Sequence, residues 1–180
     1  MPSPHVSNLG SPVSLSVQRV PTTFTTRRWQ LDDVPFLWDM LYDSIHVPDG
    51  DAPLPRSILL EHDIAHYLEG FGRERDDAQI AVDEAGARIG AAWCRTTTAA
   101  DPGYGFVAED IPELGTAIVA AWRGRGVGSR LIEELADRNP ALSLSVDDDN
   151  ESARRLYLRL GFVPLGVNGT ATTMLRRPRS

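Results

Sequence analysis

Apolar residues recur at helical spacing in four stretches of the chain, and each of these stretches predicts an amphipathic helix. The first predicted helix spans 32–44 and the second spans 56–70. The third follows a glycine-rich turn and runs over 127–138. The fourth begins at Asn150, a good N-cap residue, and ends before Gly161, which suits a C-terminal cap. About four helices are therefore expected.

Strands are predicted between these helices by short apolar runs and by strict alternation of apolar and polar residues. In the clearest case, Leu142, Leu144 and Val146 share one face of a strand while Ser residues fill the other. The predicted strands cover 24–29, 79–82, 88–95, 113–119, 141–146, 162–165 and 171–175. A turn containing Gly joins the second and third strands into a hairpin, and one helix separates the fourth from the fifth. This order indicates a mixed α/β (α+β) fold.

The length of 180 residues fits a single domain that can bury a sizeable core. Residues 1–20, rich in Ser, Pro and Val, are expected to form an N-terminal tail or arm, which leaves 21–180 as the domain. The tail lacks the charged start and the apolar centre of a signal peptide. No apolar run approaches the ~20 residues of a membrane span. We therefore expect a cytoplasmic protein that does not bind membranes.

All 18 basic residues of the chain are Arg, and 25 acidic residues give a net charge of −7. Without Lys the chain cannot form a Schiff base or a Walker-A phosphate loop. An acidic chain is also a poor general binder of nucleic acid. The charge is −13 over 31–116 and +3 over 117–180, a division that alone indicates no function, because charged stretches usually form a solvated face. Cys94 is the single cysteine, so no internal disulfide can form, and its place in a predicted strand indicates a small buried residue.

A predicted strand is joined to a predicted helix by a glycine-rich turn, Arg123-Gly124-Arg125-Gly126-Val127-Gly128-Ser129. Its glycines allow a sharp turn that exposes backbone N–H groups, and the following helix offers its unpaired N–H groups and its dipole. A pyrophosphate group fits such a turn, with Arg123 and Arg125 as charged partners. Two other interpretations stay open on these residues alone. One is a plain turn, and the other is a dinucleotide-binding fingerprint with Asp147 near the distance of its acidic residue.

This turn and the strand before it resemble motif A of the GNAT superfamily of CoA-dependent N-acetyltransferases. The motif is Arg/Gln-x-x-Gly-x-Gly/Ala after an apolar strand, and Arg123, Gly126 and Gly128 fill it. The segment 146–162 resembles the family's motif B through Val146, Asn150, Ala153, Leu156, Tyr157, Gly161 and Phe162. Two motifs in the right order and separation make the resemblance far more specific than either motif alone. It covers the chain from about 24 to 176.

The resemblance implies a single GNAT-like domain with a twisted, mostly antiparallel sheet, about four flanking helices, and a parallel, splayed central strand pair. In such proteins acetyl-CoA lies in the V-shaped opening between these strands, here 113–119 and 141–146. The pyrophosphate would rest on the glycine-rich turn, and a backbone N–H near Ile118 would polarise the acetyl carbonyl. The implied cofactor-binding residues are Ile118, Val119, Ala120, Arg123, Gly124, Arg125, Gly126, Val127, Gly128, Ser129, Asn150 and Tyr157.

The resemblance further implies direct attack of a neutral amine on the thioester, within a ternary complex. Tyr157 matches the family's usual proton donor to the leaving thiolate, and Glu113 matches the position of a common carboxylate base. Each has a simpler interpretation, because Tyr157 also lies on an apolar helix stripe and Glu113 also suits an exposed strand end. The expected function is N-acetyltransfer to an amine, on a small molecule or on a peptide or protein N-terminus. The alternative is a non-catalytic acyl-CoA sensor or interaction module.

His62 and His66 lie one helical turn apart, a spacing that metal sites use. The pattern is His-Asp-x-x-His rather than His-Glu-x-x-His, and no third ligand is apparent in the sequence. We therefore expect no metal. The resemblance implies that the acceptor lies between the loops 46–55 and 165–170. Because the acidic part of the chain, 31–116, covers elements expected to meet it, the expected partner is a small, cationic amine. The protein is expected to be a monomer or a homodimer.

Overall fold

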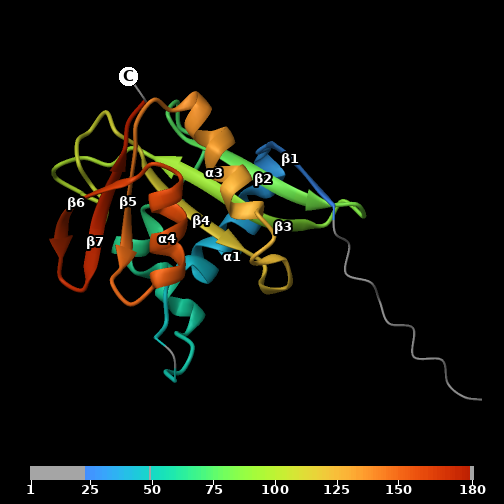
Figure 1. Cartoon of the computed structure of the whole chain (residues 1–180), viewed down its shortest axis with the longest axis horizontal. Coiled ribbons are helices and arrows are strands. Elements are labelled where there is room, and N and C mark those ends of the chain that lie inside the picture. The colour runs from blue at the N-terminus through green and yellow to red at the C-terminus, as the bar shows by residue number, and fades with distance from the viewer. Residues whose placement is uncertain (1–22, 49, 179–180) are drawn as a thin grey trace, which may run out of the picture.

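The computed structural model describes residues 23–48 and 50–178, so the predicted tail over 1–20 lies outside the described residues. The described residues form one seven-stranded sheet flanked by helices (Figure 1). The strand order is β1-β2-β3-β4-β5-β7-β6. All neighbouring strands are antiparallel except β4 and β5, which are parallel. The predicted fold class is confirmed.

Each predicted strand is found, with ends that differ by no more than three residues. The strands are β1 (Phe24–Arg28), β2 (Asp77–Asp83), β3 (Arg88–Arg95), β4 (Glu113–Ile118), β5 (Leu142–Asp147), β6 (Val163–Asn168) and β7 (Ala171–Arg176). The helices are α1 (Val34–Ser44), α2 (His62–Ala65), α3 (Val127–Arg138) and α4 (Glu151–Arg159), with 3-10 turns over Leu31–Asp33, Arg56–Leu60 and Ala120–Trp122. Within 23–48 and 50–178, no helix combines the length and the apolar character needed to cross a bilayer.

The second predicted helix, over 56–70, is wrong in its extent. A 3-10 turn ends at Leu60, Glu61 is extended (φ −68°, ψ 135°), and α2 is a single turn. Because the chain bends at Glu61, the apolar residues of this segment do not form one stripe. Leu60 is 83% exposed, whereas Tyr67 and Leu68 are buried. The apolar residues before and after Glu61 therefore belong to two separate short elements, although their spacing in the sequence resembles that of one helix.

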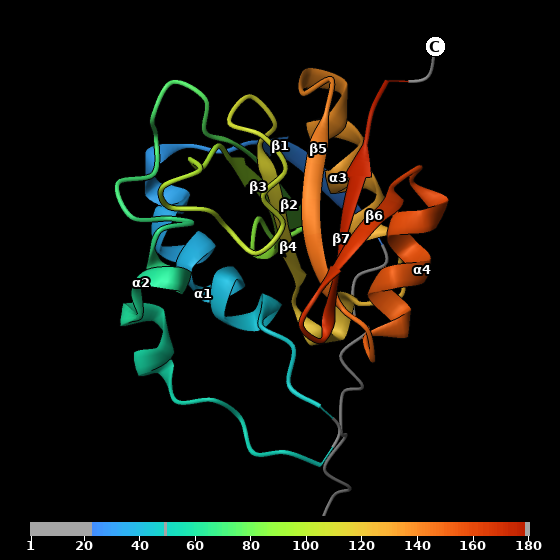
Figure 2. The same ribbon diagram turned by 90° about the vertical axis from the view of Figure 1, so that its left-hand side faces the viewer.

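Two clusters of buried side chains hold the sheet from opposite sides. On one side α3 contributes Leu131, Ile132 and Leu135, and the apolar stripe of α4 packs against the same cluster. On the other side α1 contributes Leu37 and Leu41, and the segment after α2 adds further side chains. Figure 2 shows α1 and α2 on one side of the sheet and α3 and α4 on the other. The apolar faces of α1 and α3 are thus buried, and the apolar stripe of α4 is partly buried.

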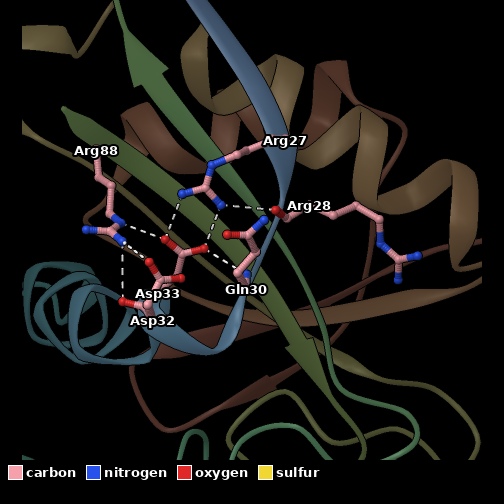
Figure 3. A network of polar contacts seen from close by, with 6 residues as sticks. All are labelled: Arg27, Arg28, Gln30, Asp32, Asp33 and Arg88. Atoms are coloured by element: carbon pink, nitrogen blue, oxygen red, sulfur yellow. Dashed lines mark hydrogen bonds and ion pairs between the residues drawn. The ribbon is translucent and has the colours of Figure 1, made fainter. Parts of the chain in front are cut away.

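A buried carboxylate fixes the entry into α1. Asp33 is 0% exposed, and its two carboxylate oxygens accept hydrogen bonds from Arg27 of β1 (2.6 and 2.8 Å) and Arg88 of β3 (2.6 Å). The backbone N–H of Gln30 also donates to this carboxylate, at 2.8 Å. Figure 3 shows how these groups converge on Asp33 from three elements. The hydrogen bonds from the two Arg side chains lower the pKa of Asp33 to about 2, against the effect of burial.

Replacing Asp33 by Asn is expected to lower the free energy of unfolding at pH 7 by about 3 kcal/mol, because two Arg side chains lose their charged partner. Since the pKa of Asp33 is lowered on folding, its contribution is present above pH 4 and is lost as pH falls toward 2. The difference between wild type and Asp33→Asn in urea unfolding should therefore shrink over this range. Asp32→Asn is the matched control, because Asp32 is exposed and its contact with Arg88 is longer, at 3.3 Å. It should cost less than about 1 kcal/mol, and equal costs for both variants would contradict the prediction.

Candidate active site

The centre of the sheet is open between β4 and β5. The two strands pair only at Glu113 and Ser143, where the N–H of Ser143 donates to the carbonyl of Pro112 at 3.1 Å. The opposite edges of both strands are fully paired, β4 with β3 and β5 with β7. Beyond Glu113, β4 therefore has a free edge on the side of β5, as the predicted splayed pair requires.

A cavity of about 410 Å³ lies at this opening. It brings together Glu113 at the start of β4 and Tyr157 on α4, the two predicted catalytic residues. The cavity is lined by Leu41, Ser44, Ile45, His46, Leu54, Ile58, Ile64, Tyr67, Trp93, Tyr104, Glu113, Leu114, Gly115, Thr116, Ser145, Asp147, Tyr157 and Ala171. Of the described residues in this lining, two are acidic and none is Arg, which favours a positively charged ligand.

Glu113 is buried rather than exposed, which excludes the simpler interpretation of a solvated strand end. Its Oε1 accepts hydrogen bonds from the hydroxyl of Tyr67 and from the N–H of Gly105, both at 2.7 Å. Its Oε2 is buried and has no hydrogen-bond partner among the residues that the structure describes. Burial raises the pKa of Glu113 to about 7, although the two hydrogen bonds act in the opposite direction. A carboxyl group with this pKa can accept a proton at neutral pH.

The loop 103–105 holds Glu113 in place. The hydroxyl of Tyr67, which donates to Glu113, accepts a hydrogen bond from the N–H of Tyr104 at 2.8 Å. A side chain at Gly103 would collide with Oε2 of Glu113, and one at Gly105 would collide with the backbone of β5. The loop therefore packs against both strands at the end where they are bridged. Its close approach depends on residues without a side chain.

Tyr157 is half-buried on the inner side of α4, with its ring edge-on to Phe162 at 5.7 Å. Burial raises the pKa of Tyr157 to about 12, so its hydroxyl keeps its proton at physiological pH. Asn150 caps α4, and its side chain accepts a hydrogen bond from the N–H of Ala153 at 3.2 Å. The capping role predicted for Asn150 is thus confirmed.

The glycine-rich turn has the backbone shape that the sequence predicted. Gly124 and Gly126 both have positive φ, 73° and 81°, and Gly126 is the N-cap of α3. The first residues of α3 therefore present backbone N–H groups that have no partner within the helix. The Nε of Arg123 donates to the carbonyl of Ile118 at 2.9 Å, and the guanidinium of Arg125 lies 5.2 Å from the ring centre of Trp122. This end of α3 suits an anionic group such as a phosphate.

The end of β4 presents one backbone donor to the opening. The N–H of Val119 donates to Ile89 of β3 at 2.9 Å, and its carbonyl accepts from Trp122 at 2.8 Å. Because backbone groups alternate along a strand, the N–H of Ile118 faces away from β3, toward the open side. Of these two predicted cofactor-binding residues, only Ile118 therefore offers its backbone N–H to a ligand.

Several residues of the cavity were not picked out by the sequence as site residues. Tyr67 and Trp93 are ordinary core residues by pattern, and only the fold brings them to the opening. Asp147 ends β5 and lines the cavity, where burial raises its pKa, and His46 lies 3.0 Å from nearby Asp149. In the sequence, Asp147 was marked by its position at the end of a central strand and by its distance from the glycine-rich turn. Of the two loops expected to enclose the acceptor, 46–55 lines the cavity and 165–170 does not.

The comparisons with known proteins agree with this geometry. Residues 36–162 match the family model described as the acetyltransferase (GNAT) family. Over 49 residues the chain is 43% identical to N-alpha-acetyltransferase RimI of Mycobacterium tuberculosis (strain ATCC 25618 / H37Rv), which covers 26% of this chain and 31% of that protein. The chain spans less than a third of the length of the first curated relatives it matches.

Two solved structures show the same fold over nearly the whole chain. A structure of histone acetyltransferase HPA2 and related acetyltransferase from Corynebacterium glutamicum has a TM-score of 0.60 at 25% identity, covering 87% of this chain and 97% of that one. YncA from Salmonella typhimurium, solved with its cofactor acetyl-CoA, has a TM-score of 0.61 at 17% identity. The match covers 88% of this chain and 95% of YncA. Since the family model matches well over half of the chain and the fold agrees, the chain belongs to the GNAT family of acetyltransferases.

Proposed function

We propose that this protein is an N-acetyltransferase that transfers the acetyl group of acetyl-CoA directly to an amine, within a ternary complex. The observation that carries the proposal is the cavity between β4 and β5, in which Glu113 and Tyr157 face the same space. Family membership supports acetyl-CoA as the donor. Acetyl-CoA supplies the activated acetyl group, and the residues of this chain bind it and move the protons.

The glycine-rich turn supports a binding site for the pyrophosphate of acetyl-CoA. The backbone N–H groups from Gly124 to Ser129 and the positive end of the α3 dipole would hold the phosphates, with Arg123 and Arg125 beside them. The N–H of Ile118 would donate to the acetyl carbonyl, and the side chains of Val119 and Ala120 would flank the pantetheine arm. Asn150 and Tyr157 would contact the donor from α4. Because Gly124 and Gly126 have backbone conformations in the left-handed region, the turn would direct its N–H groups toward the pyrophosphate.

Glu113 and Tyr157 divide the proton transfers between them. The amine must lose a proton to attack, and Glu113, with a pKa of about 7, would accept it directly or through water. As the new C–N bond forms, the C–S bond breaks, and the departing sulfur would take its proton from the hydroxyl of Tyr157. With a pKa of about 12, Tyr157 is protonated before each turnover.

Direct transfer is favoured because the single Cys is not placed to form an acyl-enzyme. Cys94 is fully buried on β3, as predicted, and burial raises the pKa of its thiol to about 12. A thiol in this state is a poor nucleophile. The chain also contains no Lys. Initial rates measured against both substrates should therefore give intersecting rather than parallel double-reciprocal lines.

A small cationic amine is the acceptor that the cavity favours. Among the described residues, the acidic side chains of its lining are Glu113, at the start of β4, and Asp147, at the end of β5. Trp93 and Tyr104 contribute aromatic rings to the same lining, and such rings attract cations. An amine with a second positive charge could place that charge near Asp147 while its reacting nitrogen lies near Glu113.

The proposal is tested by measuring CoA release with a panel of acceptors that includes diamines, neutral amines and peptides with free N-termini. We expect amine-dependent release of CoA, with the highest kcat/KM for acceptors that carry a second positive charge. Acetyl-CoA binding by calorimetry without turnover on any acceptor would instead support a non-catalytic sensor. Higher kcat/KM for neutral amines would overturn the cationic preference alone.

Gly126→Ala is expected to weaken acetyl-CoA binding about tenfold, because an L-residue resists φ near 81° and shifts the N–H groups of the turn. Gly86→Ala is a matched control, since Gly86 has the same φ of 81° in the β2–β3 turn and similar open space around it. Both variants should lose about 1 kcal/mol of unfolding free energy. Calorimetric titration with acetyl-CoA should separate them, and an equal effect on binding would argue against a role for the turn.

A further inference from the structure

Outside the cavity, three side chains with metal-binding groups converge on one point. His62 lies on α2, His66 follows its end, and Asp101 comes from the loop between β3 and β4. The Nε2 of His62 and the Nδ1 of His66 lie 3.0 and 3.1 Å from the same oxygen, Oδ1 of Asp101. One ligand atom from each residue lies within 4.8 Å of the others. We propose that these three residues form a binding site for a divalent transition-metal ion such as Zn²⁺.

The donor set and its spacing suit such an ion. Zn²⁺ binds imidazole nitrogen and carboxylate oxygen at about 2.0–2.2 Å, which places neighbouring ligand atoms about 3–3.5 Å apart. The two contacts with Asp101 already have this spacing. Imidazole ligands favour zinc, copper and nickel over magnesium or calcium. His62 and Asp101 have side chains 68% and 48% exposed, so an ion can enter and water can complete its coordination.

The ligands are held in position by other parts of the fold. Asp101 closes a tight turn in which its N–H donates to the carbonyl of Thr98 at 3.1 Å. The buried guanidinium of Arg95 donates to the carbonyl of His66 at 2.7 Å. The Nε2 of His66 is buried and has no partner among the described residues, so Asp101 is the polar partner of this ring. The site is therefore arranged before an ion binds.

A bound ion would link α2 to the loop that positions Glu113. Asp101 begins the segment in which Tyr104 donates to the hydroxyl of Tyr67 and Gly105 donates to Glu113. Tyr67 directly follows His66 in the chain, so the ion would join both sides of this hydrogen-bonded arrangement. It would thereby reduce the opening motions of the loop without contacting the cavity. The binding of the ion does not depend on the proposed acetyl transfer.

The site is tested with the full chain after removal of any affinity tag. The chain contains only four His, so the His residues of a tag would dominate the binding of Zn²⁺. Zn²⁺ titration by calorimetry should give one ion per chain, and Co²⁺ should give visible absorption bands typical of nitrogen and oxygen ligands. His62→Ala and Asp101→Asn should each weaken Zn²⁺ binding at least about tenfold, since even residues that only support a ligand have effects of this size. Asp63→Asn is the matched control, because Asp63 is an exposed carboxylate on the same turn of α2 and should bind Zn²⁺ like wild type.

Amide hydrogen exchange supplies a readout of the link to the loop. With Zn²⁺, exchange at Tyr104 and Gly105 should slow in wild type and in Asp63→Asn, and should not change in Asp101→Asn. No stoichiometric binding of Zn²⁺ by wild type, or equal binding by Asp101→Asn, would overturn the proposed site. Binding that leaves exchange at Tyr104 and Gly105 unchanged would overturn the link to the loop.

Discussion

Glu113→Gln is expected to lower kcat by about 10²- to 10⁴-fold, the range typical for loss of a general base. The amide keeps an oxygen that can accept the hydrogen bonds of Tyr67 and Gly105, so the local structure should persist. Wild-type activity should fall as pH drops below about 7, because Glu113 is then protonated and cannot accept the amine proton. The variant should lack this dependence.

The amine acceptor ionises as well, and its titration affects both proteins equally. The informative quantity is therefore the ratio of wild-type to variant kcat/KM, which should decrease as pH falls below 7. Glu109→Gln serves as a control, since Glu109 is an exposed carboxylate outside the cavity lining and should retain full activity. A ratio that does not change between pH 6 and pH 8 would exclude Glu113 as the base.

Tyr157→Phe is expected to lower kcat by about 10²-fold while leaving the Kd of acetyl-CoA nearly unchanged, because only the proton donated to the leaving thiolate is lost. The Phe ring can keep the edge-on contact with Phe162, so the melting temperature should remain close to that of wild type. Steady-state rates together with calorimetric binding measure the two quantities separately. A variant that turns over as fast as wild type would remove Tyr157 from the mechanism and leave it a packing residue.

Sequence patterns predicted the fold well wherever one element carries a complete signal of its own. The stripe on α3, the N-cap at Asn150 and the alternation in β5 all depend on neighbours close in the chain, and each is found in the structure. The segment 56–70 failed because Glu61 adopts an extended conformation that no local residue, neither Gly nor Pro, announces. The residues on either side of the bend, Leu59 and Ile64, pack against the buried cluster that contains α1, and short-range patterns do not contain such contacts.

The candidate site was predicted in part: residues marked by a motif could be identified, and residues that only the fold brings together could not. Glu113, Tyr157 and the glycine-rich turn could be identified because motifs mark them. The environment of Glu113 could not, since Tyr67 and Gly105 come from separate loops and carry no motif. The same applies to Asp101, which completes the cluster with His62 and His66 only after folding brings the loop to α2.

The burial of Glu113 also sets a limit on how stable this protein can be in alkaline solution. A carboxyl group whose pKa rises from 4.5 to about 7 on folding favours the folded state below pH 4.5. That advantage disappears as pH rises through 7, at a cost on the order of 3 kcal/mol relative to a neutral group. The burial that would suit Glu113 to accept a proton therefore lowers stability in alkaline solution, and Glu113→Gln should unfold at a higher urea concentration than wild type at pH 8.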